Sequence, residues 1–172
     1  MASKFKINDS IKINNDVYTI IKLLGHGKGG YSYLALSEKQ EEVVLKEIHH
    51  EPCDYYNFGN KIESELNDYQ RLLKTGIRIP KMITYDIEQE ILIKEYIKGE
   101  TILKLKESGI DISFFLKEVK EFANKAKEKG LNIDYYPSNF IPKDNKLYYI
   151  DYECNEYMEK WSFEVWGENF WR

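Results

Sequence analysis

The sequence predicts an α+β fold in which an antiparallel sheet comes first and helices follow. Before about residue 97, short runs rich in Val, Ile and Tyr alternate with turn formers, which is typical of strands. Apolar residues at helical spacing predict one helix over about 60–74 and a longer one over 111–129. The strands therefore gather in the first part of the chain and the longest helix lies in the second.

Composition limits the classes of function. With 172 residues, 42% of them hydrophobic, the chain can bury a core as one compact unit with room for two lobes. No apolar run approaches the ~20 residues of a membrane span, and no secretory signal is visible, so we expect a cytoplasmic protein without a membrane partner. The net charge of -4 argues against nucleic acid as a partner. Cys53 and Cys154 give no disulfide framework and no paired metal-ligand spacing.

The first two strands, over 11–13 and 17–21, lead into a glycine-rich turn with Gly25, Gly27 and Gly30. Glycines at this spacing let backbone amides approach phosphate oxygens. In a dinucleotide-binding fold such a turn must open a helix, whereas residues 31–35 are strand-like. The pattern therefore favours a hairpin that covers a nucleotide, with a flexible hairpin turn as the purely structural alternative.

A further strand over 43–48 carries Lys46, which could reach nucleotide phosphates if an acidic side chain pairs with it. In the helix over 60–74, Glu65 borders the expected buried stripe, whereas Glu63 points further toward solvent. That stripe is Ile62, Leu66, Tyr69 and Leu73. We therefore expect Glu65 to pair with Lys46, and the alternative is that both side chains are simply solvated.

Two more strands are expected over 81–85 and 91–96, after which residues 97–99 turn the chain out of the sheet. Backbone groups at such an exit can recognise an adenine edge, and a plain linker is the alternative. The helix over 111–129 follows, with Gly130 just past its end.

The long helix delivers an acidic loop that contains Asp134 and Asn139, and Asp151 follows a short strand over 146–150. Two acids and an amide can serve phosphoryl transfer, in which one Asp receives the proton of the acceptor hydroxyl and the other groups hold magnesium. Because Asp, Pro, Ser and Asn are also turn formers, an ordinary loop is the alternative.

Taken in order, these stretches resemble the protein-kinase-like superfamily, including minimal atypical bacterial serine/threonine kinases and aminoglycoside phosphotransferases. The last of these stretches, Asp151-Tyr152-Glu153, is closer to the Asp-Phe-Glu of small-molecule and atypical kinases than to Asp-Phe-Gly. The series is Gly25-x-Gly27-x-x-Gly30, Val43-Val44-Leu45-Lys46, helical Glu65, Glu95-Tyr96-Ile97, Asp134-x-x-x-x-Asn139 and Ile150-Asp151-Tyr152-Glu153.

The resemblance implies a two-lobed fold in a single kinase-like domain over 1–172. Residues 1–97 would form a lobe with a five-stranded antiparallel sheet, one helix and the glycine loop. Residues 98–172 would form a strongly reduced helical lobe, because few residues follow Asp151 and a full activation segment does not fit.

The resemblance also implies roles for the site residues, with ATP and Mg²⁺ as the expected cofactors. Asp134 would be catalytic, with Lys46 and Glu65 as the ion pair. Asn139 and Asp151 would be the metal ligands. The nucleotide would be bound by Gly25, Gly27, Gly30, Lys46, Glu95 and Ile97.

Four positions depart from the superfamily pattern. Asn132 stands where His is frequent, Tyr136 where many protein kinases carry a phosphate-contacting Lys, Ser32 where Val packs on adenine, and Lys94 at the gatekeeper position. These departures leave a nucleotide-binding pseudokinase with a regulatory role as an alternative to an active enzyme.

The function implied is that of a serine/threonine-protein kinase, with a small-molecule kinase as the second enzymatic reading. The substrate would accordingly be a protein or small-molecule hydroxyl. The aromatic tail from Trp161 to Trp171 is expected to close the lower core with a short helix. Its alternative role is a patch for a protein partner.

Overall fold

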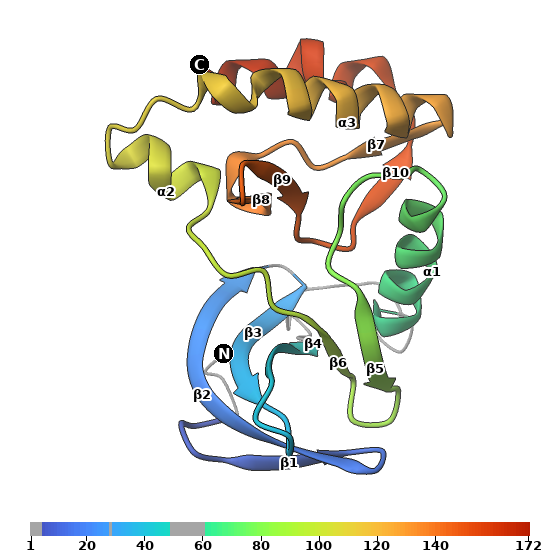
Figure 1. Cartoon of the computed structure of the whole chain (residues 1–172). Coiled ribbons are helices and arrows are strands. Elements are labelled where there is room, and N and C mark those ends of the chain that lie inside the picture. The colour runs from blue at the N-terminus through green and yellow to red at the C-terminus, as the bar shows by residue number, and fades with distance from the viewer. Residues whose placement is uncertain (1–4, 28, 49–60) are drawn as a thin grey trace. The chain divides into compact units, whose positions relative to one another are not determined.

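The computed structural model describes residues 5–27, 29–48 and 61–172 (Figure 1). Its contacts divide the chain into a first unit, Met1–Ser64 with Lys81–Tyr96, and a second unit, Glu65–Pro80 with Ile97–Arg172. Cys53 lies outside the described residues. No helix in the described ranges is long and apolar enough to cross a membrane.

The first unit is built on one curled antiparallel sheet (Figure 1). Among the described residues it has six strands in the order β1-β2-β3-β4-β6-β5, so the expected count of five is wrong. The count of five came from the resemblance, whereas the residue pattern already predicts a strand over 11–13. That strand pairs with β2 in a regular register, from Ser10 opposite Thr19 to Ile13 opposite Asp16. The strands are β1 Ser10–Ile13, β2 Asp16–Gly27, β3 Gly30–Leu36, β4 Glu42–Ile48, β5 Met82–Asp86 and β6 Ile91–Glu95.

The inner face of this sheet forms the core of the first unit. Ile13, Ala35, Leu45, Ile91 and Ile93 have no exposed surface and belong to one apolar cluster. The three isoleucines among them are β-branched and pack well on a pleated surface. The predicted strands of this region are thus confirmed, and β2 runs further than expected, to Gly27.

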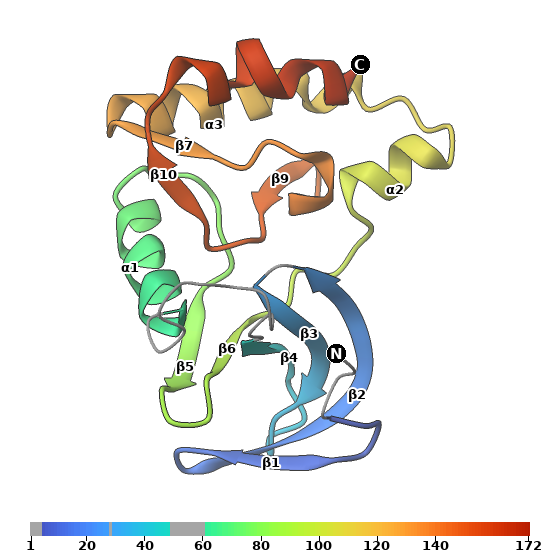
Figure 2. The same ribbon diagram turned by 180° about the vertical axis from the view of Figure 1, so that it is seen from behind.

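Helix α1, Lys61–Leu73, matches the predicted helix over 60–74. Its buried face contains Ile62, Tyr69 and Leu72, whereas Leu73 is half exposed, so the expected place of Leu73 in the stripe is wrong by one residue. The chain leaves the helix through Gly76, whose φ of 80° lies in the left-handed region that glycine adopts without strain. The second half of α1 belongs to the second unit and lies beside β10, Cys154–Glu156 (Figure 2).

In the second unit two short two-stranded sheets carry the polar loops. Strand β7, Leu131–Ile133, pairs with β10, and β8, Phe140–Lys143, pairs with β9, Lys146–Tyr149. The predicted helix over 111–129 is shorter, because residues 113–115 form a 3₁₀ turn and α3 spans Leu116–Glu128. Helix α2, Ile102–Glu107, was not predicted, although its capping residue Thr101, which accepts a hydrogen bond from the Lys104 amide, is a usual start signal.

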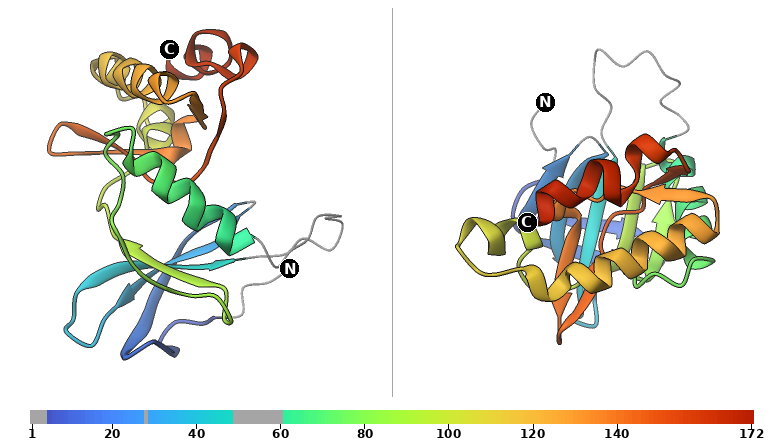
Figure 3. Two further views of the ribbon diagram at one scale, coloured as in Figure 1. Left: turned by 90° about the vertical axis from the view of Figure 1, so that its right-hand side faces the viewer. Right: turned by 90° about the horizontal axis from the view of Figure 1, so that it is seen from above.

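The aromatic tail closes the core of the second unit. It consists of 3₁₀ and π-helical turns between Glu159 and Trp171 that lie beside α3 (Figure 3). Phe163 and Trp171 are buried in the same apolar cluster as Phe122 and Ala126 of α3. The expectation that the tail covers the lower core is confirmed.

A polar network ties the segment after α1 to α3 and β9. The Arg78 side chain forms an ion pair with Glu118 and donates from Nε to the Leu147 carbonyl at 3.0 Å. The Leu147 amide donates to the same Glu118 carboxylate at 2.9 Å. One carboxylate therefore accepts from a guanidinium and a backbone amide that come from different parts of the chain.

We predict that Glu118→Ala destabilises the protein more than the matched change Glu121→Ala on the exposed side of the same helix. Because the ion pair is partly exposed, the loss comes chiefly from the unpaired Leu147 amide, and we expect about 1–3 kcal/mol. Urea unfolding of both variants measures this difference. Equal midpoints for the two variants would contradict it.

Candidate functional site

Strand β7 positions Asp134 at the start of the acidic loop. Asp134 is half-buried, and its Oδ1 accepts a hydrogen bond from the amide of Tyr136 at 3.1 Å. This bond closes a local Asx turn, a short-range preference of Asp that the sequence itself dictates. The carboxylate thus helps to shape the loop that carries it.

Asn139 connects the two acidic segments. Its Nδ2 donates to the Asp134 carbonyl at 3.3 Å, and its carbonyl accepts from the amide of Ile150 at 2.9 Å. Asp151 follows Ile150 directly, so the structure brings Asp134, Asn139 and Asp151 together within the second unit. Since the amide nitrogen is used by the Asp134 carbonyl, the Asn139 oxygen is the part of the side chain left to accept or to bind a cation.

Tyr149 supports this loop, and its place in a predicted strand is the only sign of it in the sequence. Its hydroxyl accepts from the Asp134 amide at 3.1 Å and donates to the Glu153 carbonyl at 2.7 Å. Burial raises the pKa of this hydroxyl well above its ordinary value, and the negative charges of Asp151, Glu153 and Asp134 raise it further. The Tyr149 hydroxyl therefore stays protonated next to several carboxylates.

The aromatic tail supports the same loop from the other side. Nε1 of Trp171 donates to the Tyr135 carbonyl at 2.7 Å, next to Asp134. Gly167 packs so closely on Tyr135 that a Cβ there would lie 2.6 Å from the Tyr135 Cβ. A side chain at position 167 would therefore displace the loop backbone or the tail.

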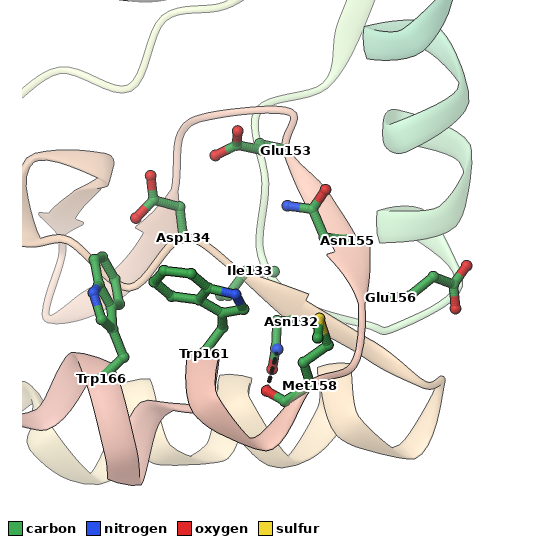
Figure 4. A pocket seen from close by; sticks show the side chains of 9 residues that line it. All are labelled: Asn132, Ile133, Asp134, Glu153, Asn155, Glu156, Met158, Trp161 and Trp166. Atoms are coloured by element: carbon green, nitrogen blue, oxygen red, sulfur yellow. Dashed lines mark hydrogen bonds between the residues drawn. The ribbon is translucent and has the colours of Figure 1, made fainter.

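A pocket of about 410 Å³ opens beside Asp134, entirely within the second unit (Figure 4). Its polar lining is Asp134, Glu153, Glu156, Asn132 and Asn155. Its apolar lining is Ile133, Met158, Trp161 and Trp166. The amide nitrogen of Asn132 donates to the Met158 carbonyl at 2.9 Å, which ties the indole-bearing segment to β7.

In the first unit, Lys46 is buried on β4, opposite Ser32 of β3 and Leu92 of β6. The glycine-rich turn is a continuation of the β2–β3 hairpin, as the sequence indicates. A Cβ added at Gly25 or Gly27 would meet no atom within 4 Å, so the surrounding protein does not require glycine there.

The remaining predicted residues lie on both units. Glu95, at the end of β6, uses its exposed side chain to accept from the Lys81 amide at 3.0 Å. Ile97 is buried and begins the second unit. Glu65 lies half-buried on α1 in the second unit, whereas Lys46 belongs to the first, so their pairing stays a prediction.

The side chains of Asn139 and Asp151, the predicted metal ligands, suit magnesium chemically. Mg²⁺ prefers oxygen ligands and is held in proteins by one or two carboxylates together with substrate phosphates. No cluster of three His, Cys, Asp or Glu side chains with metal-site geometry occurs in the part of the chain that the structure describes. A magnesium ion at Asn139 and Asp151 would therefore need further ligands, such as phosphate oxygens.

We predict that Tyr149→Phe destabilises the folded protein by about 1–3 kcal/mol, because it leaves the Asp134 amide and the Glu153 carbonyl without their buried partner. For a chain of this length each kcal/mol lowers Tm by roughly 2–4 °C. The neighbouring Tyr148→Phe is the matched control. Equal thermal midpoints for the two variants would show that the bridge contributes nothing.

Known proteins resemble this chain as follows. Dual specificity protein kinase TTK of Mus musculus is 26% identical over 176 residues, 92% of this chain and 19% of the relative. Serine/threonine-protein kinase ppk13 of Schizosaccharomyces pombe is 30% identical over 116 residues, 62% of this chain and 33% of the relative. KEOPS complex subunit Bud32 of Pyrococcus abyssi is 29% identical over 92 residues, 51% of this chain and 41% of the relative.

The chain therefore spans less than half the length of each of these relatives. No model of a known protein family matches it. Among solved structures, the BubR1 kinase domain superposes with a TM-score of 0.61 at 15% identity, over 88% of this chain and 51% of that one. The fold is that of a kinase domain, and the sequence is similar to those of kinases over half or more of its length.

Proposed function

We propose that the chain is an ATP-dependent phosphotransferase that moves the γ-phosphoryl group to a hydroxyl, with Ser or Thr of a protein as the acceptor. The observation that supports this most directly is the pair of hydrogen bonds through which Asn139 joins Asp134 to the segment of Asp151. Phosphoryl transfer depends almost entirely on positioning and electrostatics, and hydrogen bonds that keep Asp134 close to Asn139 and to the segment of Asp151 would contribute to both.

In the proposed reaction, the Asp134 carboxylate receives the proton of the acceptor hydroxyl as its oxygen attacks the γ-phosphorus. A new bond forms between the acceptor oxygen and phosphorus, and the bond from phosphorus to the bridging oxygen breaks. ADP leaves with that electron pair. The Tyr136 amide on Oδ1 keeps the carboxylate in one orientation, which favours proton transfer at a fixed atom.

The remaining residues would bind and orient the nucleotide. Asn139 and Asp151 would hold Mg²⁺, which when bound neutralises charge on the phosphate oxygens. The glycine turn with Gly25, Gly27 and Gly30 and the Lys46 ammonium would contact the phosphates. The backbone from Glu95 to Ile97 would contact the adenine.

A nucleotide-binding pseudokinase is the second candidate, and one contact favours it. Tyr136 stands where many protein kinases carry a lysine that contacts phosphate, and its ring packs edge-on against Phe170 at 5.2 Å. A hydroxyphenyl group held by the tail supplies no cation at that place. The loop would then serve nucleotide binding without rapid transfer.

We predict that Asp134→Asn lowers the rate of phosphoryl transfer by about 10²–10⁴-fold, the usual contribution of a general base. Asparagine keeps an acceptor for the Tyr136 amide, so ATP binding and Tm should change little. Asp144→Asn, in the exposed turn between β8 and β9, is the control. Transfer of radiolabelled phosphate to cell-extract proteins and to a panel of small hydroxyl compounds measures the rate and identifies the acceptor class.

Equal rates of phosphoryl transfer in the wild type and in Asp134→Asn would refute the proposal of an active enzyme and would leave the pseudokinase as the remaining candidate. Labelling of small hydroxyl compounds alone would refute a protein acceptor. Asp151→Asn should weaken the magnesium-dependent part of ATP binding, which calorimetry with and without Mg²⁺ resolves.

A further prediction concerns the proposed pair of Lys46 and Glu65. Lys46→Glu and Glu65→Lys should each weaken ATP binding, and the double reversal should recover part of the loss if the two charges interact. Lys12→Glu, on an exposed position of β1, controls for the change in net charge. Additive losses in the double variant would remove the pair from the proposal.

A further inference from the structure

Tyr149 lies at the end of β9 with no exposed surface, so it does not touch a substrate directly. Its backbone amide donates to the Arg78 carbonyl at 2.9 Å, and its ring packs on the Phe140 ring with 5.2 Å between the centres. Strand pairing places Phe140 and Tyr149 directly opposite each other. Because both the backbone and the ring are fixed, the hydroxyl is held in one place.

The Tyr149 hydroxyl joins two segments that have different roles in the proposed reaction. It accepts from the amide of Asp134, the proposed proton acceptor, and donates to the carbonyl of Glu153, two residues after Asp151. Both partners are backbone groups, so the two bonds determine where the chain runs. The hydroxyl thus holds the segment of Asp134 at a set distance from the segment of Asp151.

Asp134 is held at both of its backbone polar groups by side chains from later in the chain. Tyr149 accepts from its amide at 3.1 Å, and the Asn139 side chain donates to its carbonyl at 3.3 Å. The bond from the Tyr136 amide to Oδ1 ties the orientation of the carboxylate to this backbone. A shift of the backbone would therefore move the carboxylate that receives the proton, and about 1 Å of misplacement can cost on the order of 100-fold in rate.

We propose that Tyr149 is a positioning residue for phosphoryl transfer, because its hydroxyl keeps Asp134 where the acceptor hydroxyl can give up its proton. Since Tyr149 acts through Asp134, it should change the rate of the chemical step and leave the affinity for ATP nearly unchanged. Phenylalanine would fill the same space in the core, so packing alone does not account for the hydroxyl. The inference rests on the proposed phosphotransferase function and adds a residue to its machinery.

The pair of variants Tyr149→Phe and Thr75→Val tests this role. Thr75 is a matched control, because its buried hydroxyl also donates to one carbonyl, that of Leu72, and accepts from one amide, that of Ile77. Each variant removes one hydroxyl with two backbone partners in the second unit, so both should lose a similar amount of stability. Thr75 has no place in the proposed reaction, so only Tyr149→Phe should also lose rate.

Hydrolysis of γ-labelled ATP under single-turnover conditions measures the chemical step with water as the acceptor, so the natural acceptor need not be known. It is measured well below the thermal midpoints of both variants. We expect Tyr149→Phe to slow this step by about 10–100-fold and Thr75→Val to slow it by less than about twofold. The Kd for ATP, from calorimetry, should stay within about twofold of the wild-type value in both variants.

Amide hydrogen exchange, followed by NMR without nucleotide or metal, tests the positioning itself. In Tyr149→Phe the Asp134 amide should exchange about tenfold faster, as the loss of one hydrogen bond allows, and the Ile77 amide should keep its rate. Thr75→Val should show the reverse pattern. This readout does not depend on any catalytic activity.

The two measurements separate this inference from the proposed function. Unchanged exchange of the Asp134 amide in Tyr149→Phe would overturn the positioning role, and so would equal losses of rate in the two variants. A loss of ATP affinity as large as the loss of rate would also overturn it. A wild type that hydrolyses no ATP, together with faster exchange of the Asp134 amide in Tyr149→Phe, would refute the phosphotransferase and keep Tyr149 as the residue that positions Asp134.

Discussion

The hydrogen bonds of one buried hydroxyl organise the second unit. The Tyr149 oxygen lies between the amide of Asp134 and the carbonyl of Glu153. Its two hydrogen bonds thereby fix the distance between two loops that are separated along the chain. A buried backbone group without a partner is costly, so neither loop can move away without loss of stability. The carboxylates of both loops are consequently held near one another despite their mutual repulsion.

Much of the fold could be predicted from the sequence because the stretches concerned have strong periodicity. The strands of the first unit alternate with turn residues, and α1 has a clear apolar stripe. The shift from Leu73 to Leu72 reflects the 3.6-residue period, which a pattern of integer spacings only approximates. Strands β7 and β10, three residues each, were not predicted because their formation depends on pairing with each other, between Cys154 and Ile133 for example.

The residues of the candidate site likewise fall into those that could be predicted from the sequence and those that could not. Asp134 and Asn139 were predictable because their chemistry and local turn preferences agree at one spacing. Tyr149 and the close contact of Gly167 with Tyr135 were not, because both depend on which segments meet in space. The pocket wall at Trp161 likewise depends on the path of the chain after β10. Sequence patterns report the residues that do chemistry more readily than those that hold them in position.

The contact between Trp171 and Tyr135 has a consequence for biosynthesis. The loop with Asp134 is translated more than thirty residues before the indole that holds its backbone. Until residue 171 emerges, the nascent polypeptide lacks the donor for the Tyr135 carbonyl and the cover over Phe140. Until then the loop relies on its hydrogen bonds with Tyr149 and Asn139, and the contact of Trp171 with the Tyr135 carbonyl is added last.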